Sequence, residues 1–86
     1  MLVNLTDLMQ PALKHGYAVP CFNVFGYEDA LAVVNAAQAR NASVILAVNL
    51  DMTQFMPLNH IVGMLRPLAM SATVPVCLHL DHNYDI

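Results

Sequence analysis

Three short apolar segments, residues 17–24, 43–49 and 74–81, alternate with longer stretches of mixed polarity. The segments are rich in Val, Ile, Leu or Phe and contain few polar residues. Continuous apolar runs of this length are typical of parallel strands that are covered on both faces. The pattern therefore predicts buried parallel strands rather than the alternating pattern of a sheet with one face in water.

The stretches between these segments have the spacing of helices. Residues 28–40 and 58–71 carry apolar side chains three and four positions apart, as in helices with one buried face. A further helix over about 5–14 precedes the first strand, and Gly16 occupies the position of a C-terminal capping glycine. Helical connections between strands favour parallel, right-handed crossovers, so the chain is predicted to be an α/β protein.

Two prolines fall inside predicted helices. Pro11 and Pro67 each remove one backbone hydrogen bond and clash with a carbonyl one turn back, at a cost of about 3 kcal/mol. We expect a kinked helix at both positions, with a misplaced helix boundary as the alternative. Either Asn4 or Thr6 can cap the start of the first helix.

Strand alternation predicts where the polar residues of the strands meet. Side chains along a strand point to opposite faces in turn, so Asp81 shares a face with His79 and Cys77. In the first two predicted strands, the apolar residues that alternate with Asn23 and Asn49 are expected to face the helices. Asn23 and Asn49 then lie on the same side of the sheet as Asp81. Ligands of α/β folds bind at the carboxyl ends of strands, so Asn23, Asn49 and Asp81 are candidate site residues.

The last predicted strand ends in two histidines that bracket an aspartate. Neutral imidazole is a good zinc ligand, and His82 follows Asp81 directly, so His82 is the candidate metal ligand. His79 lies two residues earlier and is a candidate for supporting the site from below. A carboxylate beside a metal can exchange a proton with a substrate hydroxyl while the metal polarises a carbonyl. That pairing suits cleavage of a carbon–carbon bond next to a ketone.

Each of these residues also has a purely structural interpretation. Asn23 can bond a neighbouring loop, and Asn49 can be a turn residue ahead of Asp51. Asp81 can cap a helix that follows its strand, and His79 can be a hydrogen-bonded structural histidine.

Composition and charge exclude some function classes. Hydrophobic residues make up 58% of the 86 residues and charged residues 10%, against about 25% charged in typical domains. The net charge is −3, and Lys14, Arg40 and Arg66 are scattered, which argues against a nucleic-acid partner. No stretch reaches the roughly 20 apolar residues of a membrane span, and no signal peptide is evident. We therefore expect a cytosolic protein in which Cys21 and Cys77 are reduced core thiols.

Segments 16–24, 43–46 and 74–82, which ends in His-Leu-Asp-His, resemble the N-terminal region of the class II, metal-dependent ketose-bisphosphate aldolases. This family includes the fructose- and tagatose-bisphosphate aldolases, and the order and spacing of all segments match over nearly the whole chain. The resemblance implies a (β/α)8 barrel and zinc dependence. It also implies reversible cleavage of a ketose 1,6-bisphosphate to dihydroxyacetone phosphate and an aldehyde phosphate.

The resemblance also implies roles for individual residues. Asp81 matches the aspartate that exchanges a proton with the substrate C4 hydroxyl, His82 matches the first zinc ligand, and Asn23 matches a substrate-side asparagine. The segment Asn49-Leu50-Asp51-Met52 stands where the family usually has a serine followed by a small or glycine-containing stretch. That serine is associated with substrate phosphate, and Asp51 would repel a phosphate nearby.

A (β/α)8 barrel takes about 250 residues. We therefore expect residues 1–86 to be a single, truncated N-terminal unit that supplies three of eight strands. The remaining zinc ligands would come from later segments, and full-length relatives generally form homo-oligomers. The alternatives are an inactive truncated aldolase fragment, a product that acts only by association, and a barrel lyase with a non-phosphorylated substrate.

Overall fold

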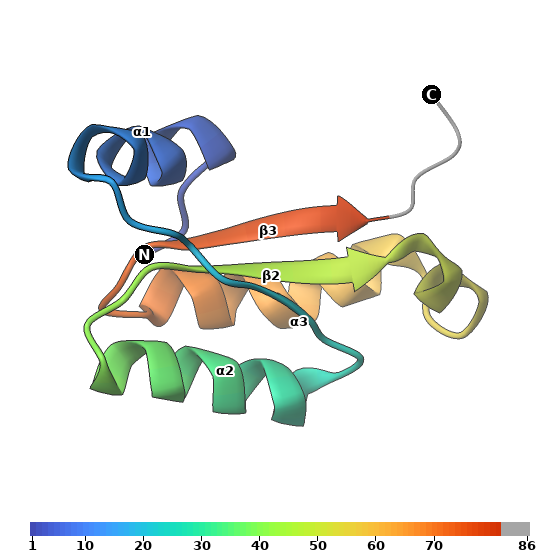
Figure 1. Cartoon of the computed structure of the whole chain (residues 1–86). Helices are drawn as coiled ribbons and strands as arrows, with labels where there is room; N and C mark the ends of the chain where they lie inside the picture. Colours follow the sequence, from blue (N-terminus) through green and yellow to red (C-terminus); the bar gives the residue numbers. More distant parts are fainter. Residues whose placement is uncertain (82–86) are drawn as a thin grey trace.

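The computed structural model of the chain describes residues 1–81, except for the side chains of Leu50 and Asp81. Its elements are α1 (Leu5–His15), β1 (Cys21–Asn23), α2 (Tyr27–Ala39), β2 (Val44–Asn49), the 3-10 helix η1 (Leu50–Gln54), α3 (Leu58–Ser71) and β3 (Val76–Asp81), as drawn in Figure 1. The strands form one parallel sheet in the order β1-β2-β3. The predicted α/β fold with parallel strands is confirmed.

The main core lies between the sheet and the helices α2 and α3, which cover the same face (Figure 1). Val34 of α2, Leu46 of β2, and Ile61 and Leu65 of α3 are each at most 2% exposed. These side chains recur at helical and strand spacing, so the apolar pattern of the sequence is the pattern of this core.

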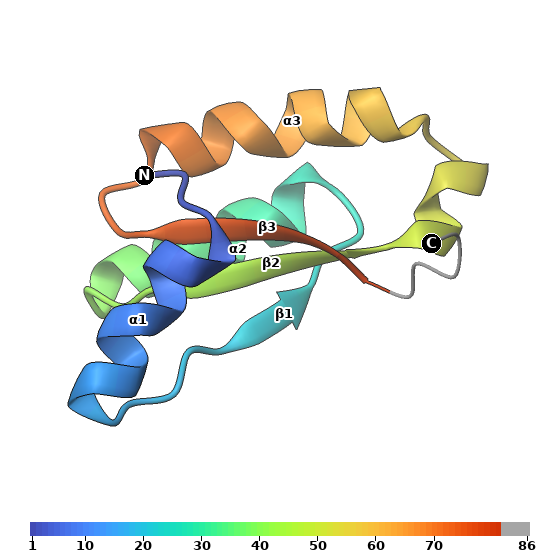
Figure 2. The same cartoon turned by 90° about the horizontal axis from the view of Figure 1, so that it is seen from above.

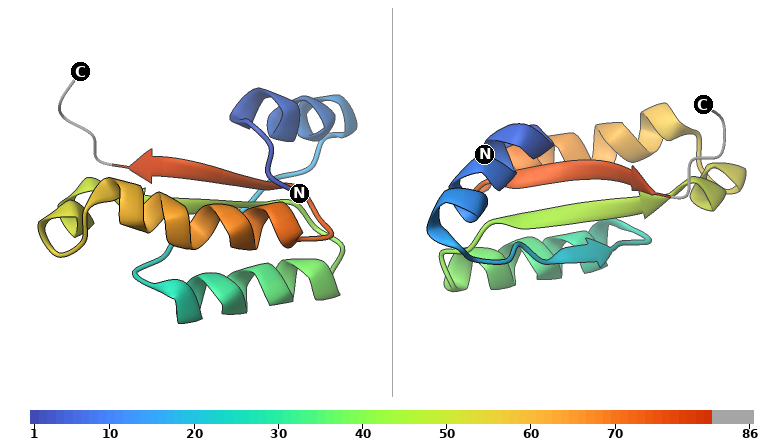
Figure 3. Two further views of the ribbon diagram at one scale, coloured as in Figure 1. Left: turned by 180° about the vertical axis from the view of Figure 1, so that it is seen from behind. Right: turned by 45° about the horizontal axis from the view of Figure 1, so that its top comes forward.

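Within residues 1–81, the opposite face of the sheet is covered only at its amino end, where α1 crosses it (Figure 2). Helix α1 contacts β3, and its side chains Leu8 and Ala12 are buried. Cys77, near the start of β3 and on this second face, is 4% exposed. The strands all run away from α1, which leaves their carboxyl ends uncovered by it (Figure 3).

Local sequence accounts for the ends of α1 and for its course. The Asn4 side chain accepts a hydrogen bond from the Asp7 N–H at 2.7 Å, and Gly16 ends the helix at φ +71°, a conformation that favours glycine. Helices α1 and α3 continue through Pro11 and Pro67, so the alternative of misplaced boundaries is wrong. Within residues 1–81, no helix is long and apolar enough to cross a membrane.

Two predicted strands prove too long. Residues 17–20 lie outside β1, and β3 begins only at Val76. Pro20 and Pro75 precede the two strands and lack an N–H, so they cannot donate to the ladder. Their carbonyls still accept hydrogen bonds from β2. The Pro20 carbonyl accepts from the Ile45 N–H at 3.0 Å, and the Pro75 carbonyl accepts from the Val44 N–H at 3.1 Å. Proline thus marks the start of each ladder.

The segment before α1 pairs with the outer edge of β3, which the sequence pattern did not predict. Leu2 forms an isolated parallel bridge with Val76. The Val3 N–H donates to the Val76 carbonyl at 2.9 Å, and the Val76 N–H donates to the Met1 carbonyl at 2.8 Å. The amino end of this edge is therefore covered, which reduces the exposed edge that a three-stranded sheet presents.

Candidate functional site

The register of the sheet brings the predicted polar residues to neighbouring positions. Ala47 pairs with Asn23 on one side and with His79 on the other, and Asn49 pairs with Asp81. Residues paired in a parallel sheet share a face, so Asn23 and His79 lie on the face opposite the main core. The predicted alternation is therefore confirmed for these two side chains, and Asn49 and Asp81 pair two residues nearer the carboxyl ends.

The environments of the candidate residues differ. Asn23 and His79 are exposed, whereas Asn49 is half-buried. Asp81 is the last residue of β3, and its backbone alone is described. His82, the candidate zinc ligand, lies outside the described residues.

Asn49 has a structural role at the end of β2. Its side-chain oxygen accepts a hydrogen bond from the Asp51 N–H at 3.0 Å, and it caps η1. This is the turn interpretation of Asn49. The cap positions the segment that follows β2 over the carboxyl end of the sheet.

A pocket of about 490 Å³ lies beside this cap, and we call it the rim pocket. Its lining residues come from the β1–α2 loop, the end of β2, and η1 with its following turn: Phe25, Asn49, Asp51, Met52, Phe55 and Met56. Phe25 is 71% exposed and Phe55 is 89% exposed. Neither phenylalanine was predicted as a site residue, although aromatic residues in segments that follow strands were the available signal.

Asp29 is a further residue of this region that the sequence pattern did not predict. Its carboxylate accepts from the N–H groups of Phe25 at 2.6 Å, Gly26 at 2.9 Å and Ala30 at 2.9 Å. The acidic residue three positions after the Gly26 cap was the sequence signal for this capping arrangement. These hydrogen bonds fix the β1–α2 loop, and Phe25 of this loop lines the rim pocket.

Comparison with known proteins identifies the family of this chain. The family model for class II fructose-bisphosphate aldolase matches residues 3–86. The chain belongs to the class II fructose-bisphosphate aldolase family. This confirms the resemblance carried by segments 16–24, 43–46 and 74–82.

Individual aldolases are similar over nearly the whole chain. The fructose-bisphosphate aldolase of Mycoplasma pneumoniae is 40% identical over 96% of the chain, and the probable fructose-bisphosphate aldolase of Bacillus subtilis is 36% identical over 95%. The YdjI aldolase of Escherichia coli superposes with a TM-score of 0.87 at 29% identity over 96% of the chain. The chain spans 30% of each of the two curated relatives and 32% of the solved structure. Its open sheet corresponds to three parallel strands of an aldolase (β/α)8 barrel.

The described residues do not by themselves make a metal centre of this aldolase family. Among the described side chains, no three His, Cys, Asp or Glu residues lie close enough to hold a metal ion. A catalytic zinc commonly takes three protein ligands. Of the two histidines that bracket Asp81 in the sequence, only His79 is among the described residues.

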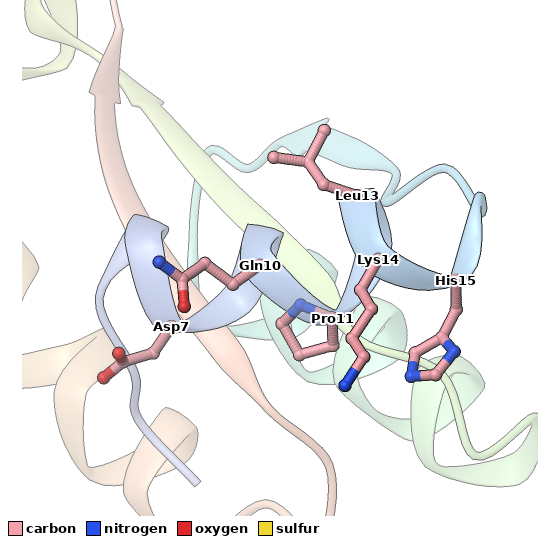
Figure 4. A pocket seen from close by; sticks show the side chains of 6 residues that line it. All are labelled: Asp7, Gln10, Pro11, Leu13, Lys14 and His15. Atoms are coloured by element: carbon pink, nitrogen blue, oxygen red, sulfur yellow. The ribbon is translucent and has the colours of Figure 1, made fainter.

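Another hollow, of about 750 Å³, is unrelated to the strand ends. Figure 4 shows its six lining residues, all of which belong to α1: Asp7, Gln10, Pro11, Leu13, Lys14 and His15. Helix α1 lies at the amino end of the sheet (Figure 2), whereas aldolase-type barrels hold their sites at the carboxyl ends. Lys14 and His15 occupy the last turn of α1, where basic residues complement the helix dipole.

The two cysteines differ in environment. Cys77 is buried as predicted, but Cys21 is exposed, so the prediction of a core thiol is wrong for Cys21. Both pair with Ile45, which places them two strand spacings or about 10 Å apart, beyond the reach of a disulfide. Burial, with a smaller contribution from Cys21, raises the pKa of the Cys77 thiol.

The two cysteines are expected to differ in their rates of alkylation. In the native 86-residue chain at pH 8, iodoacetamide is expected to label Cys21 and to spare Cys77, because Cys77 is both buried and poor in thiolate. Peptide mass mapping measures the label at each position, and urea should expose both thiols equally. Equal labelling rates in the native chain would contradict the buried position of Cys77.

Proposed function

We propose that this chain is the N-terminal part of a class II aldolase that cleaves a ketose 1,6-bisphosphate reversibly to dihydroxyacetone phosphate and an aldehyde phosphate. The observation that supports it most directly is the pairing of Asn49 with Asp81 at the carboxyl end of the sheet, in a chain matched by the family model over residues 3–86. The proposal includes a cytosolic role in carbohydrate metabolism and a homo-oligomeric complete enzyme.

The proposed chemistry assigns the proton transfer to Asp81. Its carboxylate takes the proton of the C4 hydroxyl as the C3–C4 bond breaks, and C4 becomes the aldehyde carbon. The electron pair of that bond passes to the C2 carbonyl as an enediolate, which is later protonated at C3. Asn23 is proposed to contact the substrate, with Asn49 as a further contact and His79 as support for the site.

Zinc enters this proposal through the class II family, which is generally zinc-dependent. When bound, zinc would stabilise the negative charge that develops on the carbonyl oxygen. His82 is the ligand that this chain is proposed to supply. One histidine does not make a three-ligand site, so the other ligands are proposed to come from later segments of a complete barrel.

An inactive aldolase fragment is the second candidate. The chain spans about three-tenths of the length of the Mycoplasma pneumoniae and Bacillus subtilis relatives, and its described side chains hold no three-ligand metal group. We therefore propose that residues 1–86 alone bind zinc weakly and do not cleave fructose 1,6-bisphosphate. Catalysis would require the rest of a barrel.

A hybrid enzyme tests the proposed function. Residues 1–86 would replace the matching segment of the Mycoplasma pneumoniae aldolase, to which they are 40% identical. The hybrid is expected to bind zinc and to cleave a ketose phosphate to dihydroxyacetone phosphate, while the 86-residue chain alone is expected to be inactive. A coupled assay for dihydroxyacetone phosphate measures the cleavage activity of the hybrid and of the 86-residue chain.

The parent aldolase serves as the positive control, and circular dichroism establishes that the hybrid is folded. A folded hybrid that binds zinc but cleaves neither a ketose monophosphate nor a bisphosphate would refute the proposed function. It would favour the inactive fragment.

A further inference from the structure

We infer that the two flanks of this chain are docking surfaces for the remaining βα units of an aldolase barrel, and that they bind these units even when a separate polypeptide supplies them. The partner is a class II aldolase chain that lacks its own first three strands and carries the strands and helices that follow them. The inference concerns association alone and does not rest on the proposed aldol cleavage.

One row of side chains across the sheet shows that the main core extends to both flanks. Phe22 of β1, Leu46 of β2 and Leu78 of β3 are register partners, so their side chains lie on the same face, which α2 and α3 cover. Leu46 is 0% exposed, whereas Phe22 is 47% exposed and Leu78 is half-buried. The apolar layer thus reaches both edges of the sheet, but the helices of this chain bury only its centre.

The flank at β1 has an apolar groove of about 370 Å³ along α2, which we call the α2 groove. Its lining combines the edge strand with one side of the helix and includes Phe22, Ala32, Val33, Ala36, Ala37 and Arg40. The side chains of Ala32 and Ala36 are short and exposed, which leaves room for the side chains of a partner helix. A contiguous exposed apolar surface is typical of an interaction site.

The flank at β3 has a smaller groove of about 210 Å³ along α3, which we call the α3 groove. Its lining includes Leu58, Ile61, Val62 and Leu65 of α3 and Leu78 and Leu80 of β3. Leu58 and Val62 lie one helical turn apart and are both exposed. Since β1 and β3 form the two edges of the sheet (Figure 2), each flank offers an edge strand together with one apolar side of a helix.

The edge of β3 already accepts a parallel strand. Residues 1–3 form an isolated parallel bridge with Val76, whose N–H and carbonyl both take part, at N···O distances of 2.8 and 2.9 Å. Main-chain groups at every second residue of a parallel strand point to the same side, so those of Leu78 and Leu80 face the same edge as those of Val76. The bridge stops at Val76 because α1 begins at Leu5, and another parallel strand can pair with the rest of this edge.

The comparison with aldolases indicates which partner fits the flanks. The chain spans 30% of the Mycoplasma pneumoniae aldolase. In a (β/α)8 barrel each strand is followed by a helix of the outer ring, so the units next to the two flanks bring strands for the edges and helices for the grooves. A second copy that adds its β1 to β3 brings no such helix, because α2 and α3 lie over the strands that they connect (Figure 1).

Co-expression tests this inference with the 86-residue chain as it stands. The partner is the Mycoplasma pneumoniae aldolase without the segment that the chain matches at 40% identity. A tag on the chain is expected to recover the truncated aldolase as an equimolar complex, measured by size-exclusion chromatography with light scattering. The full-length aldolase is expected not to be recovered, because its own first units occupy the corresponding flanks.

Substitutions on α2 establish whether the flank makes the contact. Ala36→Arg fills the α2 groove and adds a second cation near Arg40, so it is expected to lower recovery of the truncated aldolase about tenfold. Ala39→Arg is the matched control and is expected to leave recovery unchanged, because Ala39 is exposed on the same helix but does not line the groove. Since both alanines are exposed, circular dichroism is expected to show both isolated variants folded like the parent chain.

The outcomes separate this inference from the proposed function. A truncated aldolase that stays insoluble or unbound beside the chain would overturn the inference, and so would equal recovery by the Ala36 and Ala39 variants. Self-association of the chain that persists in excess truncated aldolase would assign the flanks to a second copy instead. Recovery is measured without substrate, so a complex that forms but lacks aldolase activity would support the inference and count against the proposed function alone.

Discussion

The substitution Asp81→Asn is expected to lower kcat of the hybrid enzyme by about 10²- to 10⁴-fold, the usual contribution of a general acid–base group. Asparagine keeps the shape of the side chain but cannot take the proton of the substrate C4 hydroxyl. The backbone of β3 should persist, because Asp81 pairs with Asn49 through main-chain groups. Zinc content, measured by mass spectrometry of the purified protein, is expected to stay at the level of the unsubstituted hybrid.

His82→Ala is the matched substitution, and it is expected to lose the metal as well as the activity. The two neighbouring residues are thus distinguished by zinc content rather than by activity, which both substitutions lower. Asp7→Asn controls for the loss of one negative charge. Equal zinc loss in the Asp81 and His82 variants would contradict the separate roles of proton carrier and metal ligand.

The layout of the fold was largely predictable from the sequence. Continuous apolar runs followed by helical spacing specify buried parallel strands with helical crossovers, and residues such as Leu46 and Leu65 lie in the predicted core. Period-two alternation then placed Asn23 and His79 on one face before any register was known. These features follow from local geometry, so they can be read from one chain.

Other features depend on tertiary contacts that a local pattern does not encode. The bridge between Leu2 and Val76 joins residues far apart in sequence. Cys21 sits in an apolar run like that of Cys77, yet it is exposed because β1 pairs only with β2 within the described residues. The rim pocket likewise brings Phe25 and Phe55 together from two different loops.

Leu46→Ala is expected to destabilise the fold far more than the removal of an exposed leucine side chain. Leu46 is 0% exposed in the central strand β2, where its register partners are Phe22 and Leu78. Removing a buried leucine side chain costs about 2–5 kcal/mol through lost transfer energy and a residual cavity. At roughly 0.05–0.15 kcal/mol per residue, a domain of this length has a free energy of unfolding of about 4–13 kcal/mol, so the loss is a large fraction of it.

Urea unfolding followed by circular dichroism measures this loss in the 86-residue chain and in the hybrid enzyme. Leu13→Ala is the matched control, because Leu13 loses the same atoms but is 78% exposed on α1. The control is expected to change the free energy of unfolding by less than about 0.5 kcal/mol, as surface substitutions usually do. Since the cost of a cavity depends on tight surroundings, equal effects of the two substitutions would mean that β2 does not pack against α2 and α3 as described.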